Sequence, residues 1–325
     1  MRVVVLGGTR FIGRAIVDEL ASAGHELLVV HRGRLEPNDI PKIRNKIPHL
    51  HCDRAELASH REELAAFQPE VVVDCRALTR ADAEIALHAL PNVERWIVIS
   101  SVDVYRAFGA LNDDRETDAV PLDEDSPVRS ERYPYRGKLP EGDDYDKLDV
   151  EEVYLHGGAT VFRLPMVYGE RDYQRREEFI LRRVRAGRKR IPFGEGSWLT
   201  CRVYVRDVGR AVTLALEHPE ATGVMNICED RTYSVRMWSR MILDAAGSDA
   251  ELVRVGDELL PEDLKETGTL SQHIAATSRK ARTRLGWTTS DPFETLRTTV
   301  RWHLAHPPAD PGEDFAADDR ALASV

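Results

Sequence analysis

One short stretch of the chain carries residue types and a spacing suited to holding phosphate. It reads GGTRFIG, residues 7–13, and stands between an apolar run and a helix-like stretch. Gly7 and Gly8 allow a tight turn and a close backbone approach to a pyrophosphate, and Gly13 lets the helix pack against the strand. The exposed N–H groups and the dipole of that helix favour phosphates. The stretch predicts a dinucleotide site; the alternative is a glycine turn that holds no ligand.

The end of the second expected strand indicates which dinucleotide is bound. A site for NAD usually ends this strand with Asp or Glu, which binds the ribose 2′-OH. Here the strand ends VVHRGR, without a carboxylate. Because a planar guanidinium binds two oxygens at once, we expect Arg10 and Arg32 to grip the 2′-phosphate of NADP from two sides, with NAD as a possible substitute. The alternative is that both arginines are solvated surface charges.

These residues need a scaffold, and the order of strand-like and helix-like stretches supplies one. Apolar runs are followed by helical patterns, for example over Glu56–Phe67 and Thr79–Leu90. Such alternation argues for a parallel sheet with helices on both faces, and so for the α/β class. The expected strands are Arg2–Leu6, Glu26–His31, His49–Cys52, Val71–Cys75, Arg95–Ser100 and Thr160–Arg163.

The chain divides into three parts. We expect a dinucleotide-binding domain over residues 1–165, with a helix and a strand returning to it from 200–230, and a mainly substrate-binding lobe over 166–305. The tail, 306–325, is acidic and proline-rich, so we expect it to be disordered. The long polar stretch 106–142 is expected to be a functional or mobile loop.

Composition narrows the class of protein. The formal net charge of −10 does not favour general affinity for nucleic acid or membranes. The four cysteines form no CxxC pair and are expected to be reduced, and the eleven histidines show no metal-binding spacing, so we expect no metal. No apolar run reaches about 18 residues and no signal peptide is evident, so we expect a cytoplasmic protein.

Several motifs resemble those of the extended short-chain dehydrogenase/reductases, the NAD-dependent epimerase/dehydratase group, over roughly residues 1 to 302. LGGTRFIG resembles the group's phosphate loop, VISSVDVY its fifth strand, VFRLPMVYG its sixth-strand segment, and CRVYVRDVGRAV and RKARTRLGW its C-terminal landmarks. The GGTRFIG form is typical of an atypical branch that includes chloroplast stem-loop RNA-binding proteins. The resemblance implies a Rossmann-type doubly wound parallel sheet with a smaller C-terminal substrate-binding lobe. A homodimer, common in the group, is a further expectation.

The resemblance also implies cofactor contacts beyond the phosphate loop. Asp53 is expected at the adenine, the VVVDCRA segment at the ribose, and the segment around Pro165 beside the nicotinamide. The full set of residues expected at the cofactor is Gly7, Gly8, Thr9, Arg10, Phe11, Ile12, Gly13, Arg32, Asp53, Arg54, Cys75, Arg76, Ala77, Ser100, Lys147, Pro165 and Val167.

The catalytic residues of the group are matched only in part. The resemblance assigns the catalytic hydroxyl to Ser101 and the lysine of the Tyr-x-x-x-Lys pair to Lys147, but Asp143 stands where the tyrosine is expected. Tyr145 lies two residues before the lysine. On a helix, residues two apart do not share a face. If the helix begins near Asp146, however, Tyr145 sits in a lead-in and could turn toward the nicotinamide.

Three further residues compete for the acid/base role. Asp103, two residues after the serine, matches a position where dehydratases and decarboxylases of the group often carry Glu, so it could act as an auxiliary base or simply cap a short helix. Tyr133 and Tyr135 lie in the long loop before the lysine. Either could replace the missing acid, or both could be packing residues.

The basic segment RRVRAGRKR, residues 182–190, resembles the region that clamps the substrate diphosphate in nucleotide-sugar enzymes. We therefore expect Arg188, with Arg202 and Tyr168, to bind substrate. The alternatives are a solvated helix face or an RNA-binding strip, although few aromatic residues accompany the strip.

Two hypotheses follow. The first is an NADP-dependent enzyme that oxidises, epimerises or dehydrates a nucleotide-linked sugar or a similar polyol. Its catalytic residues would be Ser101, Tyr145, Lys147 and Asp103. The second is a dinucleotide-binding protein without turnover that acts as an RNA-binding or redox-sensing module.

Overall fold

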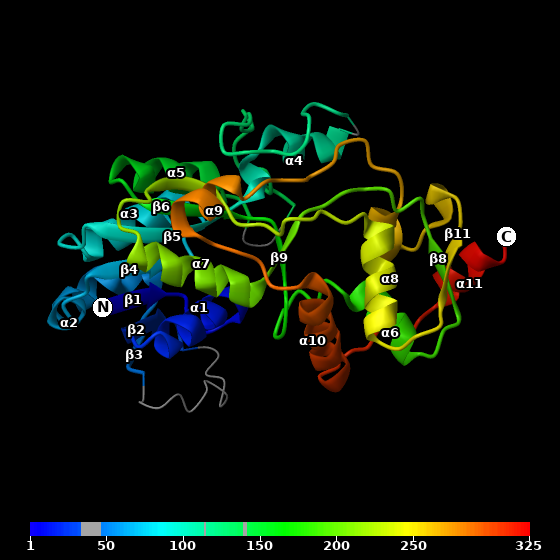
Figure 1. Cartoon of the computed structure of the whole chain (residues 1–325), viewed down its shortest axis with the longest axis horizontal. Helices are drawn as coiled ribbons and strands as arrows, with labels where there is room; N and C mark the ends of the chain where they lie inside the picture. Colours follow the sequence, from blue (N-terminus) through cyan, green and yellow to red (C-terminus); the bar gives the residue numbers. More distant parts are fainter. Residues whose placement is uncertain (34–46, 114, 139–141) are drawn as a thin grey trace.

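A seven-stranded parallel sheet forms the centre of the first domain (Figure 1). The computed structural model describes residues 1–33, 47–113, 115–138 and 142–325. The expected strands are all present, and each end differs from its expected position by at most one residue. In spatial order the strands are β10 (Gly223–Asn226), β6 (Thr160–Leu164), β5 (Arg95–Ser101), β4 (Val71–Asp74), β1 (Arg2–Leu6), β2 (Glu26–His31) and β3 (His49–His51).

The strand order predicts a ligand-binding crevice at the carboxyl ends of the strands. From β1 the chain moves outward to β2 and β3, and then returns to the other side of β1 to build β4, β5, β6 and β10. In doubly wound sheets, ligands bind at the carboxyl ends of the strands where the order reverses, which here is between β1 and β4. The loops after β1, β4 and β5 carry most of the expected site residues.

Helices cover both faces of the sheet, as buried parallel strands require. On one face α1 (Phe11–Ser22) packs closely on α7 (Val205–Glu217), because Gly209 lets the two helices meet: a Cβ there would lie 2.9 Å from the Ala15 carbonyl oxygen. The other face carries η1 (Arg54–His60), α2 (Arg61–Ala66), α3 (Arg80–Ala89) and α5 (Lys147–His156). The helix expected over Glu56–Phe67 is therefore divided into a 3-10 turn and a short α-helix.

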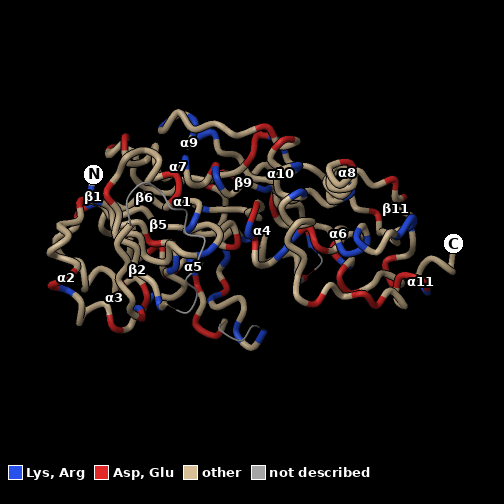
Figure 2. The backbone as a smooth tube through the Cα atoms, turned by 90° about the horizontal axis from the view of Figure 1, so that it is seen from below, with Lys and Arg blue, Asp and Glu red and all other residues tan. Residues whose placement is uncertain are grey.

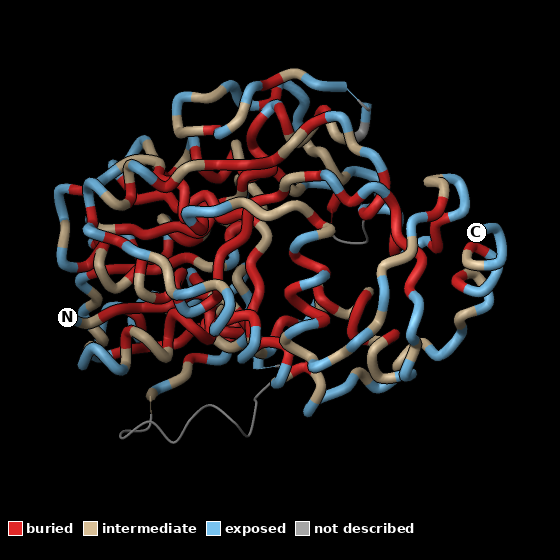
Figure 3. The backbone as a smooth tube through the Cα atoms, turned by 45° about the vertical axis from the view of Figure 1, so that its right-hand side comes forward, coloured by how far each residue is buried: buried red, intermediate tan, exposed pale blue. Residues whose placement is uncertain are grey.

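The C-terminal lobe is smaller and is built from short elements beside the crevice (Figure 1). Two parallel strand pairs occur in it, β7 with β9 and β8 with β11, and α8 packs against α6 and α10. These elements are β7 (Met166–Tyr168), α6 (Glu178–Arg185), β8 (Arg190–Phe193), β9 (Arg202–Tyr204), α8 (Val235–Ala245), β11 (Glu251–Arg254), η4 (Asp257–Leu259), η5 (Glu262–Thr267) and α10 (Pro292–Ala305). Helix α9 (Arg279–Leu285) instead packs on β10 and α7. Figure 3 shows the buried backbone concentrated in the sheet and continuing into the lobe.

The long polar stretch after β5 is anchored at several described points. It contains η2 (Val102–Val104), α4 (Arg106–Ala110) and η3 (Leu111–Asp113). The Leu122 N–H donates to the Ala275 carbonyl at 2.7 Å, and the Arg129 N–H donates to the Val104 carbonyl at 2.8 Å. These backbone bonds hold the loop near the carboxyl end of β5, where the expected catalytic residues lie.

The expectation of a disordered tail is wrong for its last part. Residues Ala316–Leu322 form helix α11, and Asp318 on that helix is fully buried. Its carboxylate accepts two hydrogen bonds, each 2.7 Å long, from the buried guanidinium of Arg183 on α6. A buried arginine needs such a partner, and the acidic composition of the tail supplies it.

Within the described ranges, no helix is long and apolar enough to cross a membrane.

Candidate active site

The phosphate loop has the geometry that its sequence predicts. Gly7 has a φ of +90°, and its N–H donates to the Val30 carbonyl at 2.9 Å, which ties the turn after β1 to the neighbouring strand β2. A Cβ on Gly13 would lie 2.1 Å from the Gly7 carbonyl oxygen, so only glycine allows the helix to start this close to the turn. The side chain of Arg10, the N-cap residue of α1, makes no capping hydrogen bond. The first N–H groups of this helix are therefore suited to a pyrophosphate at the loop.

Arg10 stands at the N-cap of α1, and its guanidinium lies 4.9 Å from the ring centre of Tyr173 in the C-terminal lobe. Phe11, buried with a φ of +34°, also meets the Tyr173 ring edge-on. The expected grip on a 2′-phosphate by two arginines is therefore modified, because Arg10 is turned to the lobe. Of the two, Arg32, which is exposed at the end of β2, keeps the position that the prediction requires. Arg34 lies outside the described residues.

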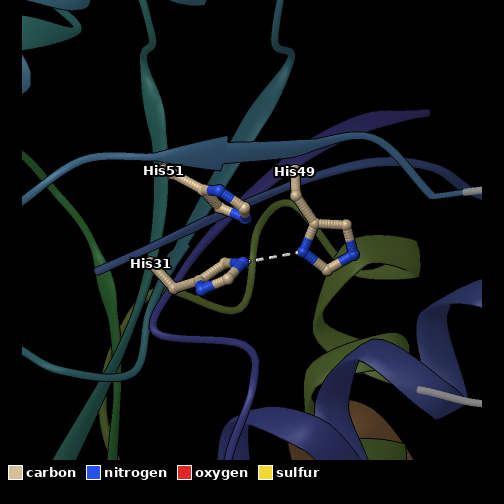
Figure 4. Close-up of side chains that lie close together, drawn as sticks. All are labelled: His31, His49 and His51. Carbon is tan, nitrogen blue, oxygen red and sulfur yellow. Dashed lines mark hydrogen bonds between the residues drawn. The ribbon is translucent and has the colours of Figure 1, made fainter. Parts of the chain in front are cut away.

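Three histidines beside Arg32 form a cluster that the sequence analysis did not find. His31 ends β2, and His49 and His51 lie on one face of β3, where His51 is the register partner of His31 (Figure 4). Their ring nitrogens lie within 4.8 Å of one another, a grouping that resembles a metal site. The Gly33 N–H, however, donates to His31 Nδ1 at 3.2 Å, so the proton of neutral His31 is on Nε2, which faces His49 Nδ1 at 2.8 Å. A nitrogen that carries this proton is not a metal ligand.

The expected cofactor contact by Arg54 is replaced by a buried ion pair. Its guanidinium donates to both carboxylate oxygens of Asp74 at 2.8 and 2.7 Å and to the Asp82 carbonyl at 2.9 Å. Asp74 ends β4 and also accepts the N–H groups of Arg76 and Ala77, each at 2.9 Å. Asp74 thus shapes the loop 75–77 that is expected to line the ribose. A carboxylate at the end of the apolar run VVVD could have indicated this role.

Of the other residues expected at the cofactor, two have side chains that hydrogen-bond within the protein, and the rest are buried or partly buried. Ser100 is buried and its hydroxyl donates to Glu151 on α5 at 2.6 Å, so it faces away from the crevice. Asp53 is exposed and caps η1 by accepting the Ala55 N–H. Pro165 and Val167 are buried where β6 passes into β7. Thr9, Ile12 and Cys75 are partly buried.

Ser101 and Asp103 meet at the end of β5. The Ser101 hydroxyl oxygen caps η2 by accepting the Asp103 N–H at 3.1 Å, which leaves its own hydrogen to be donated. Asp103 is only 4 % exposed, and burial raises the pKa of its carboxyl. One of its oxygens, Oδ1, has no hydrogen-bond partner among the described residues. Asp103 thus has the buried, partly unsatisfied carboxylate expected of an acid/base group.

Tyr145 reaches Asp103 because helix α5 begins late. The helix starts at Lys147 with Asp146 as its N-cap, so Tyr145 lies in the lead-in, as one of the two sequence alternatives requires. Its hydroxyl donates to Asp103 Oδ2 at 2.7 Å. Burial and the negative charge of Asp103 raise the pKa of Tyr145 well above 10. Tyr145 is therefore a protonated donor, not a phenolate.

Lys147 lies beneath this pair, only 5 % exposed. Its ammonium donates to the carbonyl oxygens of Ala77 and Ile99 at 2.5 and 2.9 Å, which joins the loop after β4 to strand β5. Burial lowers its pKa to about 8. The lysine is thus held between that loop and the end of the strand that carries Ser101.

Of the two loop tyrosines, Tyr135 is near the site. Its hydroxyl lies 3.4 Å from Asp103 Oδ2, and its ring meets the Tyr145 ring at 5.1 Å. Tyr133 instead carries the Arg136 guanidinium on its ring at 4.2 Å. Asp143, at the position of the missing tyrosine, is exposed and accepts the Gly137 N–H.

A buried ion pair that the sequence analysis missed positions Tyr145. Arg129 donates to Asp146 Oδ1 at 2.6 Å and to the Asp103 carbonyl at 3.1 Å. Asp146 also accepts the N–H groups of Leu148 and Tyr133. The pair therefore joins the long loop, the start of α5 and the Asp103 backbone. A capping aspartate directly before KLDVEE was the available indication.

Arg202 and Tyr168 are buried together on the lobe side of the crevice. The Tyr168 hydroxyl donates to Glu229 at 2.7 Å and contacts Thr295 at 2.6 Å. The Arg202 guanidinium lies over the Trp238 ring at 4.6 Å, and its Nη1 donates to the Thr200 carbonyl at 2.8 Å. These residues lie at the place expected for substrate contacts; both are buried, and Arg202 Nε has no hydrogen-bond partner among the described residues.

Arg188 does not share that place. It forms an ion pair with Asp319 and lies over the Phe315 ring, both in the C-terminal tail. Three other arginines of the strip are paired as well: Arg182 with Asp263, Arg183 with Asp263 and Asp318, and Arg185 with Glu178. Arg190, exposed at the start of β8, is not among these pairs. Figure 2 shows basic and acidic residues interspersed around α6 and α11. Most of the strip is thus paired with acidic residues of its own protein, which argues against its interpretation as a diphosphate clamp or an RNA strip.

Taken together, the carboxyl ends of β1, β4 and β5 form a bipartite site. A loop suited to a dinucleotide lies at one end, and a serine, a carboxylate, a phenol and a buried ammonium lie at the other. Such groups can bind a hydroxyl and move its proton.

Comparison with known proteins agrees with this arrangement. Residues 3–228 match the model of a family described as the NAD dependent epimerase/dehydratase family. Among curated proteins, the chloroplast stem-loop binding protein of 41 kDa b from Arabidopsis thaliana is 25% identical, over 99% of this chain and 84% of its own length. The 2′-dehydrokanamycin reductase of Streptomyces kanamyceticus is 26% identical, over 86% of this chain and 75% of its own length.

The fold also resembles solved structures. The UDP-glucose 4-epimerase of Thermotoga maritima, crystallised with UDP-glucose, superimposes with a TM-score of 0.69 at 22% identity, over 93% of this chain and 98% of its own. The likeness covers both the sheet and the lobe.

Proposed function

The chain belongs to the NAD dependent epimerase/dehydratase family, within the extended short-chain dehydrogenase/reductases, and from that premise we propose that it is an NADP(H)-dependent enzyme acting on a sugar or polyol. Its function is of the nicotinamide-dinucleotide-dependent oxidoreductase type. The reaction proposed is oxidation, epimerisation or dehydration at a hydroxyl-bearing carbon. The observation that carries the proposal is the contact of Tyr145 with Asp103, beside Ser101 and Lys147, at the carboxyl end of β5.

The residues at the first domain's edge fit a dinucleotide. The glycine cradle of residues 7–13 leaves no room for a side chain at Gly13, and α1 begins without a side-chain cap. This loop would hold the pyrophosphate, and Arg32 supports the preference for a 2′-phosphate, which a strand end without a carboxylate also favours. When bound, the nicotinamide supplies the hydride acceptor or donor.

The protein's own groups divide the remaining work. Ser101 donates its free hydrogen to the reacting hydroxyl of the substrate and orients it. Asp103, with one unpartnered oxygen, accepts the proton, and Tyr145 is the proton donor that shares this carboxylate. Lys147 fixes the end of β5, which carries Ser101, to the loop after β4. The Asp103–Tyr145 pair thereby takes the place of the missing Tyr-x-x-x-Lys tyrosine.

The names of similar proteins support a sugar or polyol as substrate, since they include a UDP-glucose 4-epimerase and a 2′-dehydrokanamycin reductase. The test begins with titration of the purified chain with NADP and NAD by calorimetry. It then follows the nicotinamide absorbance during incubation with free sugars, amino sugars and nucleotide sugars. We expect NADP to bind more tightly than NAD, and turnover that is lost in Ser101→Ala. A wild-type chain that binds NADP but turns over none of these substrates would favour the silent cofactor-binding alternative.

A further inference from the structure

A buried charged cluster lies directly beyond the sheet, on the lobe side of the crevice. We call it the Arg202 cluster; its members are Glu177, Arg202, Glu229, Tyr233 and Trp238. Arg202 on β9 is the register partner of Met166, two residues past the end of β6, and the Glu229 N–H donates to the Arg202 carbonyl at 2.9 Å. Two chain segments that leave the carboxyl ends of β6 and β10 thus meet strand β9 here.

The cluster carries more negative than positive charge. Glu177 and Glu229 are 2 % and 3 % exposed, and Arg202 is 5 % exposed. Both carboxylates act electrostatically on the guanidinium, although neither lies within the 4.0 Å of an ion pair. Burial raises the pKa of each glutamate to about 7 and lowers that of Arg202 to about 10. The cluster therefore balances one cation with two carboxyl groups.

Several polar atoms of this cluster have no hydrogen-bond partner among the described residues. They are Glu177 Oε2, Glu229 Oε2, Arg202 Nε and the Tyr233 hydroxyl oxygen. Folded proteins pair almost all such atoms, since a buried unpaired group costs about 1–3 kcal/mol. A group of them points to a polar partner supplied from outside the chain. Above a pH of about 7 both glutamates are ionised and their unpaired oxygens only accept, so under these conditions the partner must donate hydrogen bonds.

We propose that the Arg202 cluster receives an amine-bearing, hydroxylated end of the substrate, so that the substrate is an amino sugar or amino polyol without a phosphate at this position. This inference rests on the proposed function. An ammonium offers three donors and a positive charge to the two glutamates, and a neighbouring hydroxyl can accept from Arg202 Nε. A phosphate would have to approach the same two carboxyl groups, and like charges repel strongly in buried surroundings. Tyr233, which is only partly buried, lies beside Trp238 with ring centres 6.1 Å apart and marks the solvent side of the cluster.

The test uses the full chain, with and without saturating NADP, and three probes: glucosamine, glucose and UDP-glucose. Their affinities are measured by ligand-observed NMR. We expect glucosamine to bind at least about tenfold more tightly than glucose, with UDP-glucose weakest, because only the amine meets the carboxylates with opposite charge. In the double variant Glu177→Gln/Glu229→Gln the preference for glucosamine should disappear. Glu195→Gln, an exposed carboxylate paired with Arg254, is the matched control and should keep it.

The variants must be shown to fold, by circular dichroism and thermal unfolding. Tyr233→Phe, which removes one hydroxyl at the solvent side, is the second variant and should weaken every sugar probe by about threefold to tenfold through one lost hydrogen bond. Tightest binding of UDP-glucose, equal binding of all probes, absence of binding, or a preference that survives the double variant would each overturn the proposal. NADP titration of the same samples is independent: a chain that prefers glucosamine but binds no NADP contradicts the proposed function instead.

Discussion

At the scale of single residues, this site differs from a tyrosine–lysine pair in the hydrogen-bond partner of the phenol. Tyr145 donates to a carboxylate, while the Lys147 ammonium donates to two backbone carbonyls. A neighbouring ammonium would favour the phenolate, whereas burial and Asp103 favour the neutral phenol. We therefore propose Asp103 as the base and the tyrosine as its hydrogen-bonded acid.

This assignment is tested by conservative substitutions. We expect Asp103→Asn and Tyr145→Phe each to lower kcat by about 10²–10⁴, the usual range for removing an acid/base group. The Tyr135 hydroxyl lies farther than that of Tyr145 from Asp103 Oδ2, so Tyr135→Phe should keep kcat within about tenfold of wild type. Because burial raises the pKa of Asp103, the rate should fall on acidification at a pH above the ordinary aspartate range. The measurements are steady-state rates across pH and NADP affinity, which all three variants should retain.

Lys147 gives a prediction that needs no substrate. Burial lowers its pKa from 10.5 to about 8, so between these values the unfolded chain binds a proton that the folded chain has lost. The stability of wild type relative to Lys147→Met should therefore rise with pH across this window, by about 3 kcal/mol in total. Urea unfolding of both proteins at several pH values measures the difference in their free energies of unfolding. Groups that titrate alike in both proteins cancel in this difference. A difference that is constant with pH would show that Lys147 has an ordinary pKa.

At the scale of elements, the start of α5 decides where Tyr145 points. The sequence analysis left two helix starts open, and it placed no weight on Arg129. The structure resolves the choice because Asp146 caps the helix and is itself held by that arginine. A helix begun two residues earlier would have turned Tyr145 away from the lysine face.

We expect Arg129→Met to destabilise the protein by about 1–3 kcal/mol, since the buried Asp146 carboxylate loses its buried partner and keeps only the partly exposed Arg132 as a basic neighbour. The Arg129 and Asp146 side chains are only 4 % and 0 % exposed. Arg297→Met on α10, which breaks an exposed pair with Glu294, is the control and should cost less than about 1 kcal/mol. Chemical denaturation measures both. Equal, small effects would show that the Arg129 pair does not hold the loop.

The sheet itself could be predicted from the sequence because the patterns that mark its strands lie within short stretches of the chain. Apolar runs mark most of the strands, with the three-residue β3 an exception, and a glycine loop marks the first turn. The histidine cluster was not accessible in this way. It depends on the register between β2 and β3, which brings His31 beside His51 although twenty residues separate them in the chain.

At the scale of the whole molecule, the parts that sequence could not supply are those made by long-range ion pairs. The basic strip reads as a surface for an anionic partner, yet its charges meet aspartates that lie up to 135 residues away. Composition correctly identified the tail as acidic, but it could not show that one of its carboxylates enters the lobe. The side-chain partners of Arg54 and Ser100, two residues expected at the cofactor, were not predicted for the same reason, since they are distant in sequence.

The tail gives a prediction at this scale. Asp318→Asn should lower the free energy of unfolding by about 1–3 kcal/mol, because fully buried Arg183 would lose one of its two acidic partners and keep Asp263. Asp319→Asn, one residue farther on and 62 % exposed, should cost less than about 1 kcal/mol. Urea unfolding compares the two. If both variants matched wild type, the docking of α11 would contribute nothing to stability.

The docking of α11 also bears on how the protein is made. Arg183 is synthesised 135 residues before Asp318. A nascent chain can assemble the sheet while translation continues, but until that late helix is made the fully buried arginine of the lobe has Asp263, which is 36 % exposed, as its acidic partner. The lobe is therefore completed only after α11 has been synthesised, and its ion-pair network is the last part of the fold to close.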